Sequence, residues 1–253
     1  MSGRIRLDQA LEQRGLSPSR SRARDAILRG TVTVNGVVAG KPNQQVGPDD
    51  AIAIADPATS YVSRAALKLI AGLDAGGVAV DGRVCLDVGS STGGFTQVLL
   101  ERGAARVYAV DVGHEQLHPG LRAEPRVVSL EGTNARDLTA DTIAEPIDVV
   151  VSDISFVSVT KVLAAPLALC APAADAVILF KPQFEVGREH VGKGGIVTDA
   201  AESARAMAEV IAFVETTGFP HFLSVPSPIA GGDGNRETVL VFRRADWTSA
   251  VLS

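Results

Sequence analysis

The sequence predicts an α/β protein in which a mostly parallel sheet ends in antiparallel strands and is preceded by a small α+β unit. From about Val84, apolar strands alternate with helices, a pattern typical of a parallel sheet covered on both faces. The last two strands, near 219–226 and 238–242, have no helix between them, which predicts the antiparallel end. The first fifty residues instead show two short helices, the second of them basic, and an Asn-Gly hairpin, so they predict a separate unit.

The overall composition is typical of a soluble globular protein. The chain has 253 residues, of which 46% are apolar and 21% charged, enough for one large domain or two smaller ones. No apolar run is long enough to cross a bilayer and the N-terminus has no apolar signal core, so we expect a cytoplasmic protein. Cys85 and Cys170 lie in apolar segments and are expected to be reduced, although a pairing in space stays open.

Residues 1–58 are expected to form the small unit. One helix is predicted over Arg6–Arg14 and another over 19–29, with Gly30 at its end. A hairpin follows around Asn35-Gly36. The first fifty residues contain eight Lys or Arg and five Asp or Glu, so this segment has a net charge of +3 and the remainder −8. Such a local excess is typical of a nucleic-acid-binding module, although a solvated helix face would also explain the arginines.

This unit resembles the small RNA-binding domain named after the fourth protein of the small ribosomal subunit. The matching features are the RLD opening at Arg6, the Ser-Arg spaced helix, Gly30 after it and the V-x-V-N-G hairpin. The resemblance implies binding to structured RNA, which is held mainly by shape and phosphate contacts. The residues expected to contact RNA are Arg4, Arg6, Arg20, Arg22, Arg24, Arg29 and Lys41.

A linker is predicted over 59–62, because the stretch around it is rich in Pro, Ser and Thr, and the larger domain over 63–253. Ser63 is expected to be the N-cap of a helix that runs to Leu73. The parallel strands of the sheet are then expected near 83–88, 106–111, 126–130, 147–152 and 175–181. The last helix is expected near 199–217.

The stretch Val84–Thr96, VCLDVGSSTGGFT, predicts a ligand site at the start of a helix. Its spacing matches neither the dinucleotide fingerprint nor the phosphate-binding P-loop. An acid before the glycines, Asp87, suits a ligand with a cationic end, such as S-adenosylmethionine. A second acid, Asp111, ends the next strand, where ribose hydroxyls are commonly bound. A tight strand–helix crossing without a ligand is the alternative, which the two acids disfavour.

Four charged residues fall at strand ends or element starts, where such a sheet has its active face: Lys68, Asp153, Lys181 and Glu237. Charges there are costly unless they are paired, so a structural ion pair between Asp153 and Lys181 is one interpretation. The other is a catalytic group in which Lys181 takes a proton from a hydroxyl, while Asp153 and Glu237 hold the two ammonium groups. We expect no metal, because His114 and His118 lack a third ligand.

The whole chain resembles the TlyA family of FtsJ-like ribosomal RNA ribose methyltransferases, some of which are labelled haemolysins. The most specific stretches are LDVGSSTGGFT and KPQFEVG, and the others are VSRAALKL, GTNARDL, VVVSDISFVSV and GNRETVLVF. The resemblance implies a class I methyltransferase fold with S-adenosyl-L-methionine as cofactor, acting on a cytidine 2′-hydroxyl of ribosomal RNA. It places the four charged residues on the catalytic tetrad. With Asp87, the implied cofactor pocket comprises Gly89, Ser91, Thr92, Gly93, Gly94, Phe95, Asp111 and Asn134.

Two departures from the family pattern bear on partners and coupling. Tyr61 stands where better-known members have tryptophan, and the chain ends soon after Trp247. The short tail favours large-subunit RNA, with small-subunit RNA left open. Ribosomal RNA or a ribosomal subunit is the expected partner, and a monomer is the favoured state. The alternatives are a non-catalytic RNA-binding or ribosome-assembly factor, and a membrane-lytic protein, for which no apolar span or amphipathic basic helix is evident.

Overall fold

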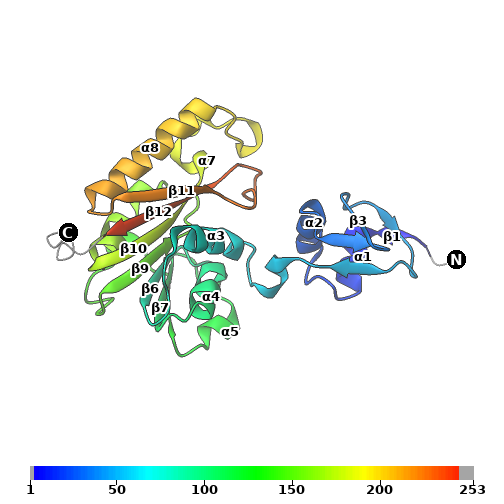
Figure 1. Cartoon of the computed structure of the whole chain (residues 1–253), viewed down its shortest axis with the longest axis horizontal. Coiled ribbons are helices and arrows are strands. Elements are labelled where there is room, and N and C mark those ends of the chain that lie inside the picture. The colour runs from blue at the N-terminus through cyan, green and yellow to red at the C-terminus, as the bar shows by residue number, and fades with distance from the viewer. Residues whose placement is uncertain (1–2, 245–253) are drawn as a thin grey trace. The chain divides into compact units, whose positions relative to one another are not determined.

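The computed structural model describes residues 3–244 and contains two compact units, which divide in sequence between Ser60 and Tyr61 (Figure 1). This division falls inside the predicted linker, 59–62. The tail after Trp247, which favoured large-subunit RNA, lies outside the described residues. Across residues 3–244, none of the helices has both the length and the apolar character needed to cross a membrane.

The small unit consists of two helices packed on short strands. Its elements are β1 (Ile5–Arg6), α1 (Leu7–Gln13), α2 (Arg20–Leu28), β2 (Val32–Val34), β3 (Val37–Val38), β4 (Gln45–Val46), β5 (Ile52–Ile54) and the short helix η1 (Pro57–Ser60). The predicted hairpin is confirmed, since β2 and β3 pair antiparallel around Asn35 and Gly36, whose φ angles are 52° and 79°. Strand β5 pairs with the other edge of β2, and β1 pairs with β4.

The large unit contains a seven-stranded sheet in the order β11-β12-β10-β9-β6-β7-β8. Its strands are β6 (Val84–Val88), β7 (Arg106–Asp111), β8 (Val127–Glu131), β9 (Ile147–Ser152), β10 (Cys170–Phe180), β11 (His221–Pro226) and β12 (Thr238–Arg244). Strands β6 to β10 are parallel, and β12 runs antiparallel between β10 and β11. The predicted fold class, including the antiparallel end, is therefore confirmed.

Helices cover both faces of this sheet (Figure 1). They are α3 (Ala66–Gly76), α4 (Gly94–Glu101), α5 (Pro119–Arg122), α6 (Ala164–Ala168), α7 (Pro182–Glu185) and α8 (Ala200–Thr216), with short 3-10 turns η2 (Ala135–Asp137), η3 (Val159–Lys161), η4 (Arg188–His190) and η5 (Lys193–Gly195). Alternate residues of each strand enter opposite cores: Leu86 packs in the core that includes α8, and Cys85 in the core beneath α3 and α4.

Helix α3 begins two residues later than the sequence predicted. Ala65, not Ser63, is its N-cap, and no side chain caps it. Ser63 instead lies in the preceding turn, where its Oγ accepts a hydrogen bond from the Ala65 N–H at 3.2 Å. Gly72 lets α3 lie against the sheet, since a Cβ there would be 2.5 Å from Val239 Cγ1. This close packing fixes the position of Lys68, one turn earlier in the helix.

Candidate active site

The order of the strands brings the predicted catalytic residues to one edge of the sheet. Phe180 pairs with Thr238, so Lys181 at the end of β10 lies beside Glu237 at the start of antiparallel β12. Ser152 of β9 pairs with Ile178 on one side and with Val88 on the other. The residues at this edge therefore line up in the order Glu237, Lys181, Asp153, glycine turn and Asp111, about 5 Å from strand to strand.

Three oxygen atoms surround the Lys181 ammonium group. Its Nζ lies 2.6 Å from Asp153 Oδ1 and donates hydrogen bonds to the Asp153 carbonyl at 3.2 Å and to Ser155 Oγ at 2.8 Å. The residue is 6% exposed, whereas the Asp153 side chain is 19% exposed. The contact with Asp153 Oδ1 is an ion pair without a hydrogen bond, so two hydrogen bonds, to the Asp153 carbonyl and to Ser155 Oγ, fix the direction of the ammonium group. This arrangement is compatible with both interpretations of Asp153 and Lys181, the structural ion pair and the catalytic group.

Lys68 and Glu237 form a second ion pair. Lys68 Nζ donates to Glu237 Oε2, and the two side chains are only 8% and 3% exposed. Helix α3 supplies the lysine, and the loop before β12 supplies the carboxylate. Because Glu237 lies beside Lys181 in the sheet, both pairs belong to one buried patch of alternating charge, in which neighbouring opposite charges reduce the cost of burial.

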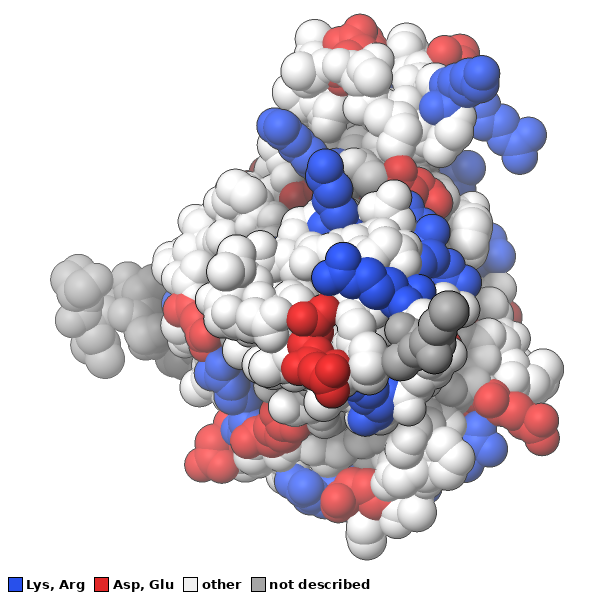
Figure 2. Space-filling model, turned by 90° about the vertical axis from the view of Figure 1, so that its right-hand side faces the viewer, with Lys and Arg blue, Asp and Glu red and all other residues white. Residues whose placement is uncertain are grey.

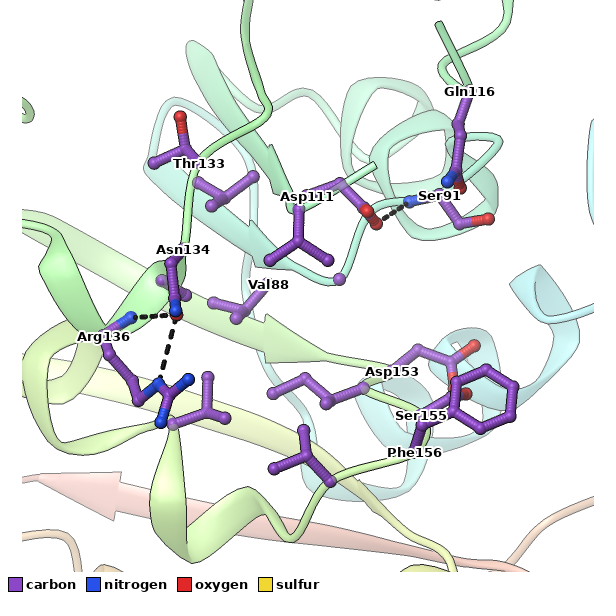
Figure 3. A pocket seen from close by; sticks show the side chains of 17 residues that line it. Val88, Ser91, Asp111, Gln116, Thr133, Asn134, Arg136, Asp153, Ser155 and Phe156 are labelled. Atoms are coloured by element: carbon purple, nitrogen blue, oxygen red, sulfur yellow. Dashed lines mark hydrogen bonds between the residues drawn. The ribbon is translucent and has the colours of Figure 1, made fainter. Parts of the chain in front are cut away.

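A cavity of about 380 Å³ opens beside this patch, at the ends of β6, β7 and β9 (Figure 3). It is lined by Val88, Gly89, Ser91, Val110, Asp111, Val112, Gln116, Thr133, Asn134, Ala135, Arg136, Asp153, Ile154, Ser155, Phe156, Val157 and Val162. The Asp111 carboxylate accepts hydrogen bonds from the backbone N–H of Ser91 at 2.8 Å and of Gly113 at 2.7 Å. Asn134 Oδ1 accepts from Arg136, which fixes the orientation of the amide and keeps the oxygen away from other donors.

A smaller cavity, about 140 Å³, lies along the glycine turn. It is lined by Ser63, Ala65, Gly89, Ser90, Ser91, Thr92, Gly94, Phe95, Asp153 and Ser155. Asp153 and Ser155 line both cavities, so the two spaces adjoin at the residues that hold Lys181. A ligand in the large cavity could therefore extend toward the buried charges.

The glycine turn needs its glycines for conformation and for close approach. Gly89 has a φ of 83°, and a Cβ there would lie 3.3 Å from the Cα of Ile154. Gly93 is the N-cap of α4 with a φ of 95°, and it lines neither cavity. A side chain at Gly94 would clash with Ser63, since the added Cβ would be 2.7 Å from the Ser63 Cβ.

Asp87 lies behind the turn. It is fully buried and lines neither cavity. The predicted contact between Asp87 and a cofactor ammonium would therefore be indirect, with another group between them. Its Oδ2 accepts a 2.6 Å hydrogen bond from Thr96 Oγ1, while Oδ1 has no hydrogen-bond partner among the described residues. Burial, together with the nearby carboxylates of Asp153 and Asp111, raises the pKa of Asp87 to about 7.

Sequence reasoning did not single out Ser155, Phe156, Gln116 or Arg136 as lining residues. All lie in loops or short turns after strands, where hydrophobic periodicity gives no signal. Phe156 is the most conspicuous: its side chain is 91% exposed, its φ is 71°, and its ring lies 5.4 Å from that of Phe184. A left-handed backbone at an exposed aromatic residue is uncommon and is found mostly where function requires it.

The basic residues of the small unit fall into two groups. Figure 2 looks onto this unit and shows Lys and Arg side chains across its face. Four of the predicted RNA contacts are exposed and a fifth, Arg6, is half-buried; the exposed ones are Arg4, Arg20, Arg24 and Lys41. Arg29 instead pairs with Asp56, and Arg22 donates to the Ala58 carbonyl at 2.6 Å. Those two arginines hold the segment at 56–58 as well as adding positive charge.

Comparison with known proteins agrees with this architecture. The FtsJ-like methyltransferase family matches residues 61–244, and the S4 domain family matches residues 5–52. The "16S/23S rRNA (cytidine-2'-O)-methyltransferase TlyA" of Mycobacterium tuberculosis is 46% identical over 244 residues, 96% of this chain and 91% of its own. "Hemolysin A" of Brachyspira hyodysenteriae is 40% identical over 94% of this chain and 99% of its own.

A solved structure from Streptococcus thermophilus, described as a hemolysin, has a TM-score of 0.74 and 34% identity. The match covers 97% of this chain and 90% of that one, so it extends through both units. With its S4 domain, its methyltransferase sheet and relatives that match over nearly its full length, the chain belongs to the TlyA family of FtsJ-like methyltransferases.

Proposed function

We propose that this enzyme transfers a methyl group from S-adenosyl-L-methionine to the 2′-hydroxyl of a cytidine in ribosomal RNA, in the cytoplasm. The observation that supports it most directly is the placement of the Lys181–Asp153 and Lys68–Glu237 pairs beside a cavity at the same sheet edge. Relatives of this chain bear the name of that reaction. Neither rival activity, membrane lysis or RNA binding without catalysis, accounts for two buried ion pairs beside a ligand-sized cavity.

The large cavity fits the cofactor in size and chemistry. Its volume lies within the range of small-molecule sites, and a nucleoside needs apolar walls with a few polar groups. Val88, Val110 and Ile154 would supply the walls against the adenine, and the Asp111 carboxylate the acceptors for ribose hydroxyls. Asn134 Nδ2 would donate at the adenine end, because its Oδ1 is taken by Arg136. The smaller cavity would hold the amino-acid end.

The chain's own residues would position and deprotonate the ribose hydroxyl. The bound cofactor supplies a methyl group already activated for transfer, so the remaining requirement is a base close to it. Lys181 Nζ is the nitrogen that would take the hydroxyl proton. To do so, the lysine must be in its uncharged amine form. Asp153 holds that nitrogen in place, and Glu237 holds Lys68 as the second positive charge. Ser155 lies between Lys181 and both cavities.

RNA would be bound by both units. In the small unit, exposed arginines and lysine suit the phosphate backbone of a structured RNA. In the large unit, the exposed ring of Phe156 lies at the large cavity and offers a face for stacking against an unpaired base. A ribose in the middle of a helix is less accessible than one beside an unpaired base, so an exposed aromatic residue suits this substrate.

The decisive experiment offers labelled S-adenosylmethionine with separated small and large ribosomal subunits that lack the modification, using Lys181→Ala as the inactive control. Label in the large subunit's RNA alone supports the activity and the large-subunit preference. Label in both subunits supports the activity and contradicts that preference. Absence of label with cofactor bound contradicts these substrates, and absence of both label and cofactor binding favours the non-catalytic RNA-binding protein.

A further inference from the structure

The carboxylate of Asp8 is at the centre of a small charged network in the N-terminal unit. It is 2% exposed and lies in the first turn of α1. Arg6 donates to it through Nε at 3.0 Å and Nη2 at 2.8 Å, and Arg20 through Nε at 3.1 Å. The backbone N–H of Gln9 adds a fourth donor at 2.9 Å. Both oxygens are thus fully used, so Asp8 itself has no acceptor left for a ligand.

The two arginines remain half exposed while they are held. Their side chains are 41% and 48% accessible. Arg20 uses Nε on Asp8, which leaves both Nη groups without a partner within residues 3–244, and Arg6 likewise keeps its Nη1 free. Two half-exposed guanidinium groups, both bound to Oδ2 of one carboxylate, therefore keep these N–H groups available for a ligand. Such a fork matches the geometry of phosphate oxygens.

The segment that carries Lys41 runs past the same point. The Asp8 N–H donates to the Pro42 carbonyl at 3.1 Å and the Leu7 N–H to the Gln44 carbonyl at 2.8 Å. Strand β1 continues this contact by pairing Arg6 with Gln45. Lys41 is exposed and directly precedes Pro42, so a third cation lies at the same edge of the unit. The chain thus gathers positive charge from three separate segments around one buried carboxylate.

We propose that Asp8 is a positioning residue of the RNA-binding surface, holding Arg6 and Arg20 so that their free N–H groups bind neighbouring phosphates of the RNA backbone. This inference rests on the proposed RNA-binding role of the small unit. The two guanidinium groups hold the pKa of Asp8 at about 2, so the carboxylate stays ionised in any working buffer. Without the Asp8 carboxylate, the Arg6 and Arg20 side chains would repel each other and move independently. Each would then lose more conformational entropy on binding RNA.

The sign of the effect makes the inference testable. Replacing Asp8 by Asn removes one negative charge from a surface that binds a polyanion, so charge alone predicts tighter binding. Loss of orientation predicts the opposite. We expect Asp8→Asn in the full-length protein to weaken binding to a transcribed large-subunit ribosomal RNA about fivefold, and to reduce the slope of log K against log salt by about one.

Asp49→Asn is the matched control, because Asp49 is exposed in the same unit and its loss changes the net charge equally. It should not weaken RNA binding, and neither variant should change the affinity for S-adenosylmethionine. If Asp8→Asn binds RNA as tightly as the wild type, or more tightly, the inference is wrong. A wild-type chain that binds no RNA overturns both this inference and the RNA-binding role. If the wild type binds RNA but transfers no methyl group, the comparison of RNA affinities between Asp8→Asn and Asp49→Asn still tests the inference.

A second experiment separates orientation from a folding defect. In a chain that already carries Arg6→Gln and Arg20→Gln, the positioning role is gone, so adding Asp8→Asn should weaken RNA binding no further. If Asp8 acted only by maintaining the fold of the small unit, the same addition would lower the affinity again, and the inference would be contradicted. Thermal unfolding followed by circular dichroism on the same variants reports the structural contribution directly.

Discussion

Lys68 and Glu237 are 169 residues apart in the sequence and form an ion pair that is almost closed to solvent. The lysine comes from the helix that opens the large unit, and the glutamate directly precedes the last strand. Their contact joins the first helix of the large unit to its last strand, at the sheet edge where Lys181 and Asp153 form the second pair. The integrity of the site therefore depends on the completed fold and on no single segment.

Breaking this pair should cost stability as well as activity. Glu237→Gln leaves the Lys68 ammonium buried without its carboxylate, which we expect to lower the free energy of unfolding by about 3 kcal/mol. Replacing both residues, as Lys68→Met with Glu237→Leu, should restore most of that stability but no methyl transfer. Urea unfolding of the three proteins measures the first effect. A single variant as stable as the wild type would show that the pair contributes nothing to folding.

Lys181 should be indispensable for transfer and dispensable for binding. Lys181→Ala removes the nitrogen that would take the hydroxyl proton, so we expect the single-turnover rate to fall at least about a hundredfold with cofactor affinity nearly unchanged. Lys181→Arg tests whether positive charge is enough, because a guanidinium cannot lose its proton in a protein. We expect it to be inactive as well. Substantial transfer by the arginine variant would contradict a role as base.

Ser155 is expected to act on rate more than on binding. Its Oγ accepts from Lys181 Nζ at 2.8 Å, and it lines both cavities. Ser155→Ala removes one of the two hydrogen-bond acceptors of Lys181, so the lysine should be less well aligned and kcat should fall about tenfold while KM for RNA changes little. Ser155→Thr keeps the hydroxyl and should recover most of the rate. Equal losses in both variants would point to crowding of the cavity instead.

Asp87 should make the folded state less stable as pH rises. Its pKa is about 7 in the folded protein against an ordinary value of 3.8. Between these values the unfolded chain has released the proton while the folded chain still holds it, so stability falls as pH increases through this window. The full decrease is at most about 4 kcal/mol. Urea unfolding at pH 4 and pH 7 measures it.

The isosteric variant Asp87→Asn provides the control for this titration. Its amide oxygen still accepts from Thr96 Oγ1, but it has no proton to lose, so its stability should lack the decrease assigned to Asp87. The variant should gain on the wild type as pH is raised from 4 to 7. If the difference between the two proteins does not change with pH, the buried carboxyl does not titrate in this range.

Local sequence determined most elements of this fold to within about three residues, although β10 begins at Cys170, five residues before the expected 175. The strands at 106–111 and 147–152 begin and end where apolar β-rich runs predicted, and the Asn35-Gly36 turn forms the hairpin. These features depend on side-chain alternation and on backbone preferences, which act over a few residues. The start of α3 was misplaced because Ser63 offers a capping hydroxyl, yet here that hydroxyl bonds within the preceding turn.

The sequence also marked Lys68, Asp153, Lys181 and Glu237 as a set and offered Asp153 as a partner for Lys181, but the contact between Lys68 and Glu237 is a property of the tertiary structure. The strand order brings Glu237 beside Lys181, and the packing of α3 at Gly72 brings Lys68 to Glu237. The same holds for Asp8, whose two arginines lie on different elements. Local preferences choose helix, strand or turn, whereas only the packed chain decides which charges meet, because burial and long-range contact fix their partners.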